Sequence, residues 1–306
     1  MRCTSPRTVG FLSDGKTLCW SQKHYSKEFP TFQLPCSKCL SCRLEYARQW
    51  AIRCIHEAMM HEESCFLTLT YDDQHLKSEK LIYKDFQDFM KRLREKYPHK
   101  QISYFVTGEY GDKNKRPHWH ACIFGHIPED SKYKYSNDRG DKIFQAETLK
   151  SLWPMGISEY GTITFESAGY CARYSAKKLH HGPDGHQYEP ISKKSSKHAI
   201  GKRWLEKYWQ DAFTHGRIIL PDGKSCSIPR YYEKWLLKHN PSAWRRYVTE
   251  IKHKITLEAE TKELQTKKEE KLINLKRSGL KGLQISRTKV ANKILEEKFK
   301  QLKTKL

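Results

Sequence analysis

The chain has 306 residues and a mass of 36.2 kDa, which suffices for one large domain or for a domain with appendages. Lys and Arg number 57 against 35 Asp and Glu, and the resulting net charge of +22 favours a polyanionic partner, above all nucleic acid. Aromatic residues make up 12% of the chain, which excludes wholesale disorder, and no apolar run approaches the roughly 18 residues of a membrane span, so we expect a soluble intracellular protein.

The first 42 residues are rich in loops. From Leu44 to Ala58, apolar residues recur at three- and four-residue spacing, which predicts an amphipathic helix. The alternating segment 66–71 predicts a strand. Apolar spacing over 86–97 then predicts a second helix, which Pro98 ends.

A β-hairpin follows, with its arms at 102–109 and 118–124. The polar segment 126–142 predicts a loop, whereas 157–164 resembles another strand and 167–179 a helix. Strands with helices between some of them predict an α+β domain on a mainly antiparallel sheet.

The composition changes after this domain. Segment 182–200 is rich in Gly, Pro, Ser and Lys, which is typical of a boundary or loop. Residues 201–247 hold four of the eight tryptophans and are expected to pack together. From Val248 onward the only aromatic residue is Phe299, and 16 Lys and Arg stand against 8 acidic residues, so we expect a solvated helix or a disordered basic arm.

Two histidines share one face of the predicted strand 118–124. Alternate side chains of a strand point the same way, so His118 and His120 face one side while Trp119 packs on the other. Two such imidazoles can chelate a divalent ion, and Glu109, at the end of the partner arm, should lie near His118 as an oxygen ligand. Taken alone, the histidines would be interpreted as a partly exposed strand pair, and Glu109 as a solvated acid.

Two tyrosines lie one helical turn apart in the predicted helix 167–179. Tyr170 and Tyr174 are each followed three residues later by a base, Arg173 and Lys177. A phenol with a pKa of about 10 is a poor nucleophile at neutral pH, so it needs a metal-polarised electrophile or a nearby cation. A packed core or interface pair is the alternative, but the repeated spacing to a base favours chemistry.

Three of the ten cysteines form a tight cluster at Cys36, Cys39 and Cys42. An iron–sulfur run would need the next cysteine at position 46, where Tyr46 stands. Tetrahedral zinc takes four ligands, so a structural zinc site requires a further residue. The candidates are Cys3, which we favour, Cys19, His24 and His56. Reduced cysteines without a metal are the alternative.

In this order, the strand 66–71, Glu109 with the His118-Trp119-His120 pair, and the Tyr170/Tyr174 helix resemble the three motifs of HUH rolling-circle endonucleases. The chain is most similar to the replication initiators of gokushovirus-type microviruses. Their cysteine cluster and Arg-rich helix resemble the segment 35–50, and the resemblance covers about residues 1–180.

The resemblance implies an HUH fold, a central antiparallel sheet flanked by helices, with a helical or basic C-terminal extension. We expect four parts. They are a Cys-rich segment and helix at 1–60, the HUH core at 61–182, a Trp-rich packed extension at 183–247, and a Lys-rich helical or disordered tail at 248–306.

The resemblance also implies a nicking and strand-joining enzyme. His118, His120 and Glu109 would hold Mg²⁺ or Mn²⁺, and Tyr170 or Tyr174 would attack the scissile phosphate, with Lys177 beside them. Attack leaves a 5′-phosphotyrosine and a 3′-hydroxyl primer, and a second cleavage releases circular single-stranded DNA. The implied partners are single- and double-stranded origin DNA and the host helicase and polymerase, in the bacterial cytoplasm and without a membrane.

Two other functions fit part of the sequence. A plasmid-type initiator or relaxase would use the same chemistry. A non-enzymatic, zinc-stapled nucleic-acid-binding protein would explain the charge and the cysteines. It would leave Glu109, the histidines and the tyrosines unexplained.

Overall fold

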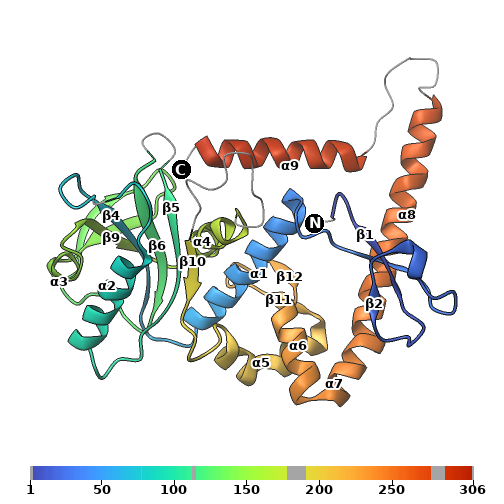
Figure 1. Ribbon diagram of the computed structural model, residues 1–306, viewed down its shortest axis with the longest axis horizontal. Coiled ribbons are helices and arrows are strands. Elements are labelled where there is room, and N and C mark those ends of the chain that lie inside the picture. Colours follow the sequence, from blue (N-terminus) through green and yellow to red (C-terminus); the bar gives the residue numbers. More distant parts are fainter. Residues whose placement is uncertain (1–2, 77, 112–114, 178–190, 277–286, 305–306) are drawn as a thin grey trace. The chain divides into compact units, whose positions relative to one another are not determined.

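The computed structural model describes residues 3–76, 78–111, 115–177, 191–276 and 287–304. Within these ranges, the side chains of residues 174–177, 275–276, 287–288 and 300–304 are not described. The chain divides into two compact units (Figure 1). The first consists mainly of Arg7–Trp209, and the second of Arg2–Pro6 with Gln210–Leu306.

Among the described residues, seven strands of the first unit form one sheet in the order β10-β5-β6-β4-β9-β8-β7, and each neighbouring pair is antiparallel. The strands are β4 (Ser64–Tyr71), β5 (Ser103–Tyr110), β6 (Pro117–Phe124), β7 (Lys132–Ser136), β8 (Lys142–Gln145), β9 (Gly156–Gly161) and β10 (Ile191–Lys194). The flanking helices are α1 (Leu40–Ala58), α2 (Tyr83–Lys96), α3 (Glu147–Leu152) and α4 (Phe165–Lys177). This arrangement confirms the predicted α+β class.

Helices α2 and α3 cover one face of the sheet (Figure 1). Alternate residues of β4 are buried, which follows from the two-residue period of a strand. Helix α2 contributes the apolar positions spaced three and four residues apart that the sequence predicted. Together these elements form the larger core, which includes Leu67, Phe86, Phe89, Trp119 and Leu152.

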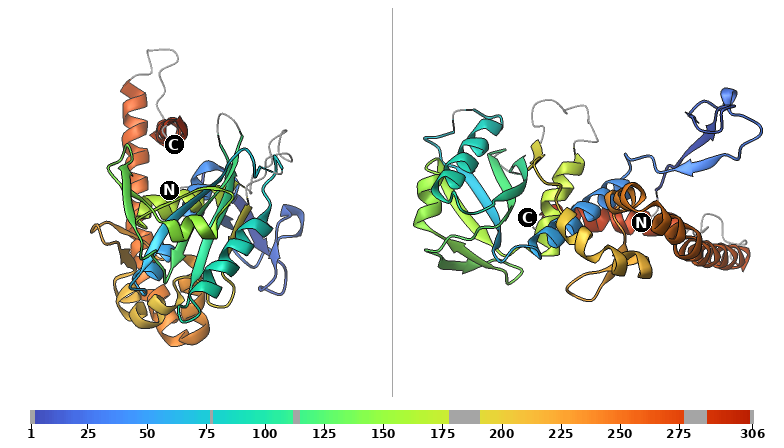
Figure 2. Two further views of the ribbon diagram at one scale, coloured as in Figure 1. Left: turned by 90° about the vertical axis from the view of Figure 1, so that its left-hand side faces the viewer. Right: turned by 90° about the horizontal axis from the view of Figure 1, so that it is seen from below.

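Helices α1 and α4 lie side by side on the other face (Figure 2). Small residues of α4, Ala168 and Ala172, are fully buried with Ala51 of α1 in the second core. Because these side chains are short, the two helices approach each other and the sheet closely. The second core therefore fixes α4 against the face of the sheet on which β6 presents its histidines.

The predicted loop at 126–142 is wrong in part, because β7 and the start of β8 lie within it. These strands form an antiparallel hairpin at the edge of the sheet. Every residue of β7, with the sequence Lys-Tyr-Lys-Tyr-Ser, is exposed, so the strand has no buried apolar face for a sequence pattern to report.

Strand β10 extends the sheet at the opposite edge, where it pairs with β5. It comes from the segment 182–200, whose composition predicted a boundary or loop. The sheet therefore includes a strand from beyond residue 182, and the four-part division of the chain stays a prediction.

The rest of the first unit is a small antiparallel sheet near the N-terminus and the helix that leads into the second unit. The sheet consists of β1 (Arg7–Phe11), β2 (Leu18–Cys19) and β3 (Phe32–Leu34), with the short helix η1 (Gln22–His24) between β2 and β3. Helix α5 (Lys202–His215) runs from the first unit into the second.

The second unit is largely helical. Its elements are the hairpin β11 (Arg217–Ile219) and β12 (Ser225–Ser227), then α6 (Arg230–His239), α7 (Pro241–Arg246), the π-helix η2 (Tyr247–Lys252), α8 (His253–Lys276) and α9 (Arg287–Thr304). The described side chains of α8 are mostly exposed, as the tail composition led us to expect. Among the described residues, no helix combines the length and apolar character needed to cross a bilayer.

Candidate active site and cysteine cluster

The register between β5 and β6 brings the predicted metal ligands together. Glu109 pairs directly with His118, and Thr107 with His120, so the carboxylate and both imidazoles lie on one face of the sheet. Trp119, between the histidines, is fully buried in the core on the opposite face. The alternation predicted from the sequence is therefore present.

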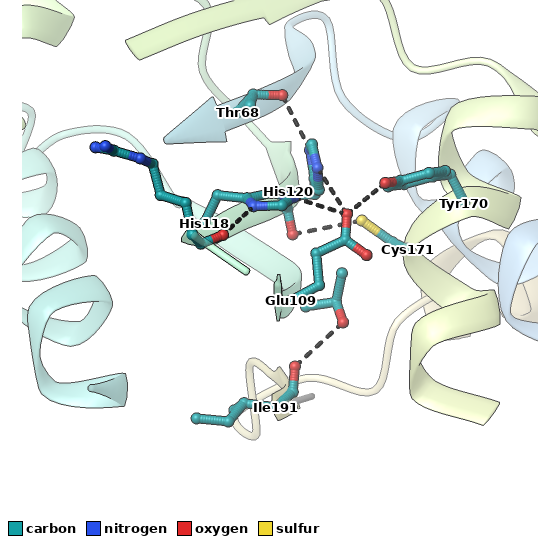
Figure 3. Close-up of polar contacts among 9 residues, drawn as sticks. Thr68, Glu109, His118, His120, Tyr170, Cys171 and Ile191 are labelled. Atoms are coloured by element: carbon teal, nitrogen blue, oxygen red, sulfur yellow. Dashed lines mark hydrogen bonds and ion pairs between the residues drawn. The ribbon is translucent and has the colours of Figure 1, made fainter. Parts of the chain in front are cut away.

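The two imidazoles converge on a single carboxylate oxygen (Figure 3). Nε2 of His118 and Nε2 of His120 each lie 3.0 Å from Oε1 of Glu109. The Glu109 side chain is 2% exposed, whereas the histidines are 18% and 13% exposed. A substrate can thus reach the imidazole side of the cluster, while the protein encloses the carboxylate.

The cluster has the protonation states of a metal site. Burial favours the neutral carboxyl of Glu109, but hydrogen bonds from His118 and His120 outweigh burial and hold its pKa well below the ordinary value. Burial lowers the pKa of His120 below its ordinary value, against the attraction of Glu109. An ionised carboxylate and a neutral imidazole are the forms that bind a divalent cation.

The geometry also fits a metal ion. The Glu109 and histidine ligand atoms all lie within 4.8 Å of one another. Neighbouring ligands of an octahedral ion, each about 2.1 Å from it, are about 3.0 Å apart, which matches the observed spacing. Oε2 of Glu109 is buried without a hydrogen-bond partner among the described residues, and a cation would satisfy that oxygen.

Helix α4 brings a phenol to the same carboxylate. The hydroxyl of Tyr170 donates a hydrogen bond to Oε1 of Glu109, and the Tyr170 ring packs edge-on against His120 with centroids 4.9 Å apart. The helix begins with reciprocal bonds. The Ser167 N–H donates to Thr164 Oγ1 at 3.1 Å, and the Thr164 N–H donates to Ser167 Oγ at 2.8 Å. This cap fixes the start of the turn that carries Tyr170.

The chain matches a known family over this part of the fold. The family model of the ORF2-type replication-associated protein covers residues 64–179, which include β4, Glu109, the histidines and α4. The replication-associated protein VP4 of Bdellovibrio phage phiMH2K is 44% identical, with 100% of this chain and 99% of the relative covered. The chain belongs to the phage replication-associated protein family.

Two further relatives carry the same description. The replication-associated protein ORF4 of Chlamydia phage 1 is 34% identical over 70% of this chain and 56% of its own length. The replication-associated protein ORF2 of Spiroplasma virus 4 is 28% identical over 76% and 80%. No solved structure matches the chain. These relatives confirm the resemblance to microvirus-type replication initiators drawn from the three motifs.

The remaining predicted residues of the family's tyrosine helix are only partly described. Tyr174 and Lys177 belong to α4, but their side chains lie outside the described part of the chain. The guanidinium of Arg173 lies over the Tyr170 ring, 5.6 Å from its centroid. Arg173 therefore places a positive charge next to the one phenol that the structure describes in α4.

Two site contacts were not predicted from the sequence. Oγ1 of Thr68 on β4 lies 3.0 Å from Nδ1 of His120, and the Cys171 thiol donates to the His120 carbonyl oxygen at 3.4 Å (Figure 3). Because Thr68 pairs with His120 across β4 and β6, the alternation of the strand 66–71 already held the relevant signal.

The cysteine cluster includes the residue that we favoured as its fourth member. The sulfur atoms of Cys3, Cys36, Cys39 and Cys42 all lie within 4.8 Å of one another. Four thiolates in tetrahedral contact with zinc would be about 3.8 Å apart, so the set fits such an ion. Cys39 is the N-cap of α1, and its N–H donates to the sulfur of Cys36 at 3.3 Å. The four thiols are a candidate metal site, and zinc stays a prediction.

Proposed function

We propose that this protein is the rolling-circle replication initiator of a single-stranded DNA phage and acts in the cytoplasm of its bacterial host. In this function it nicks the origin of the double-stranded replicative form, remains attached through a 5′-phosphotyrosine, and leaves a 3′-hydroxyl that primes synthesis. It later cleaves and rejoins the displaced strand, so that circular single-stranded DNA is released.

One observation carries the proposal. The phenol oxygen of Tyr170 contacts the same carboxylate oxygen on which His118 and His120 converge. A nucleophile within the ligand set of a cation is the arrangement that phosphodiester transfer requires, because the attacked phosphate must touch both. Glu109, His118 and His120 would hold Mg²⁺ or Mn²⁺, which when bound neutralises charge on the phosphate.

The residues of the chain account for the rest of the cleavage step. Tyr170 is oriented by its bond to Glu109, so its oxygen is held at the metal ligands. When this oxygen attacks phosphorus, the bond from phosphorus to the 3′-oxygen breaks and a phosphotyrosine forms. The proton that the phenol loses is balanced by the proton that the 3′-hydroxyl gains. Arg173, over the Tyr170 ring, favours the phenolate.

A second tyrosine makes the cycle complete. Tyr174 follows Tyr170 by one turn of α4, so its backbone lies about 6 Å further along the helix. We propose that it cleaves the regenerated origin while Tyr170 holds the first strand, and that Lys177 stabilises the phosphate during either attack. The free 3′-hydroxyl then attacks the phosphotyrosine and closes the circle.

Phenylalanine substitutions test this mechanism, because they keep both rings and remove only the nucleophilic oxygens. The double variant Tyr170→Phe with Tyr174→Phe should form no covalent protein–DNA species with labelled origin DNA in Mn²⁺ on a denaturing gel. Each single variant should retain one cleavage but release circles slowly or not at all.

The matched control is Tyr133→Phe, which removes a hydroxyl from an exposed tyrosine of β7 and should leave the adduct unchanged. A covalent adduct from the double variant would place the nucleophile elsewhere. Absence of cleavage by the wild-type chain would favour the non-enzymatic DNA-binding protein. Host helicase and polymerase are the partners that the 3′-hydroxyl primer requires.

A further inference from the structure

A basic cavity lies at the end of the sheet opposite the active site. It has a volume of about 460 Å³ and is formed by the start of β5, the residues around the end of β10, and parts of α1, α2 and α5. Ser103, in its wall, precedes Glu109 by six residues on β5, which corresponds to about 20 Å along an antiparallel strand. The cavity is therefore separate from the metal ligands.

Five cationic side chains and one carboxylate line this basic cavity. They are Arg94, Lys100, Lys194, Lys197, Arg203 and Glu57.

The carboxylate is already used within the fold. Glu57 accepts a hydrogen bond from the N–H of Gly201 at 2.6 Å and lies 3.3 Å from Nε2 of His61. Lys100 is the one cation of the cavity with a close carboxylate, Glu63, at 2.7 Å among the described residues.

Other cations of the cavity have neutral partners. Arg94 donates to the carbonyl oxygen of Ile102 at 3.0 Å, and Lys194 lies over the Trp50 ring, 4.9 Å from its centroid. Neither partner carries a charge, so the positive potential of the cavity is retained. Such a concentration of uncompensated positive charge in a concave surface attracts anions.

One polar atom of the wall needs a partner. The hydroxyl oxygen of Ser103 is buried and has no hydrogen-bond partner among the described residues. A buried hydroxyl without a partner is unfavourable, and an anion with acceptor oxygens would satisfy it. Phosphate has this chemistry, since its oxygens accept hydrogen bonds from hydroxyl, ammonium and guanidinium groups together.

We infer that this basic cavity binds backbone phosphates of a DNA strand, as a second DNA contact remote from the cleavage centre. The inference rests on the proposed function, in which DNA is the substrate. At the rise of duplex DNA, 20 Å corresponds to about six nucleotides, so one strand is long enough to reach both places. The contact would hold the DNA without taking part in cleavage.

The test removes two exposed cations of the cavity together, in the full chain, as Lys194→Gln with Lys197→Gln. Binding of fluorescein-labelled dT30 is measured by anisotropy over a range of salt concentrations. Loss of two phosphate contacts should reduce the slope of log K against log salt by about 1.4, because single strands lose about 0.7 per contact. Nicking of phage single-stranded DNA at saturating protein should be unchanged.

The matched control, Lys80→Gln with Lys150→Gln, removes the same charge from exposed positions of the first unit that do not line the cavity. It should keep the wild-type slope. A wild-type slope in the cavity variant would overturn the inference while nicking by the same protein leaves the proposed function intact. Competition by dATP that the cavity variant abolishes, with its dT30 slope unaltered, would assign the cavity to free nucleotides and also overturn it.

Discussion

Oε1 of Glu109 accepts contacts from His118, His120 and Tyr170, while Oε2 has no partner among the described residues. The carboxylate therefore organises the site through one oxygen and leaves the other for a cation. His118 is held from behind, since its Nδ1 lies 3.0 Å from the carbonyl oxygen of Arg116. Such contacts fix the tautomer that directs Nε2 toward the metal.

Thr68 should control metal affinity through His120, because Thr68 Oγ1 is the group beside Nδ1 of that ring. The variant Thr68→Val keeps the shape of the side chain and removes the hydroxyl. Loss of such a contact to a metal-ligating histidine typically weakens binding 10- to 100-fold, or about 1.4 to 2.7 kcal/mol. Titration of Mn²⁺, followed by calorimetry, measures the change.

Thr70→Val is the matched control, since Thr70 lies on the same strand and face but pairs with His118 rather than His120. It should bind Mn²⁺ as the wild type does. Equal Mn²⁺ affinity in Thr68→Val and the wild type would show that the hydroxyl does not position the ring.

The sequence predicted the metal ligands but not their supports. Strand alternation and hairpin pairing are local rules, and they placed Glu109 opposite His118 and Trp119 in the core. A single strand threonine such as Thr68 has no characteristic spacing to identify it. Cys3 was favoured by its residue type, but its distance to the other sulfurs depends on long-range folding that no local pattern contains.

Among the elements, α2 shows how a helix becomes fixed to a sheet. Phe86, Phe89, Met90 and Leu93 are at most 1% exposed, and they form one stripe against the face of β4 and β6. The period of apolar residues is strong over this segment, so the helix was predicted with nearly correct limits. The hairpin of β7 and β8 was missed because an exposed edge strand has no apolar face.

Removing a ring from this stripe should destabilise the first unit. Phe89→Ala leaves a cavity in the larger core and should lower the free energy of unfolding by about 3 to 5 kcal/mol. Urea unfolding followed by tryptophan fluorescence measures the loss. Met59→Ala, at a side chain that is 57% exposed, should change the same quantity by less than about 0.5 kcal/mol. Similar values for the two variants would contradict the assignment of Phe89 to the core.

At the scale of the whole molecule, two buried histidines make stability depend on pH. Burial lowers the pKa of His56 to about 3 and that of His126 to about 4, compared with an ordinary value of 6.5. Below pH 6.5 the unfolded chain therefore binds protons that the folded chain does not. The free energy of unfolding should fall as the pH decreases from 6.5 to 4, by up to about 1.4 kcal/mol per pH unit for each histidine.

His126→Phe should reduce this acid sensitivity. Both ring nitrogens of His126 are buried without hydrogen-bond partners among the described residues, and the ring packs 4.5 Å from that of Tyr97, so phenylalanine fits the site without a titrating group. Urea midpoints at pH 7 and pH 4.5 measure the difference. His24→Phe, at an exposed position, should retain the wild-type dependence, and an unchanged dependence in His126→Phe would rule out His126 as its source.

The net charge of +22 is spread over both units, and the last helix carries part of it. Deleting residues 287–306 removes seven basic and two acidic residues. It spares Ile251 and Ile255, which pack close to Gly216 in the second unit. The truncated chain should bind dT30 more weakly and with a shallower salt dependence, measured by anisotropy. An unchanged salt slope would show that α9 does not contact DNA.

Trp119 connects the two faces of the sheet, because it stands between the metal ligands in the chain and its indole N–H donates to the Tyr71 hydroxyl at 3.0 Å. That hydroxyl donates in turn to Asp85 of α2 at 2.8 Å. The site therefore cannot loosen while α2 stays packed. Amide hydrogen exchange in β6 should proceed only through cooperative opening of the whole unit, and heat should abolish metal binding and native packing at one temperature.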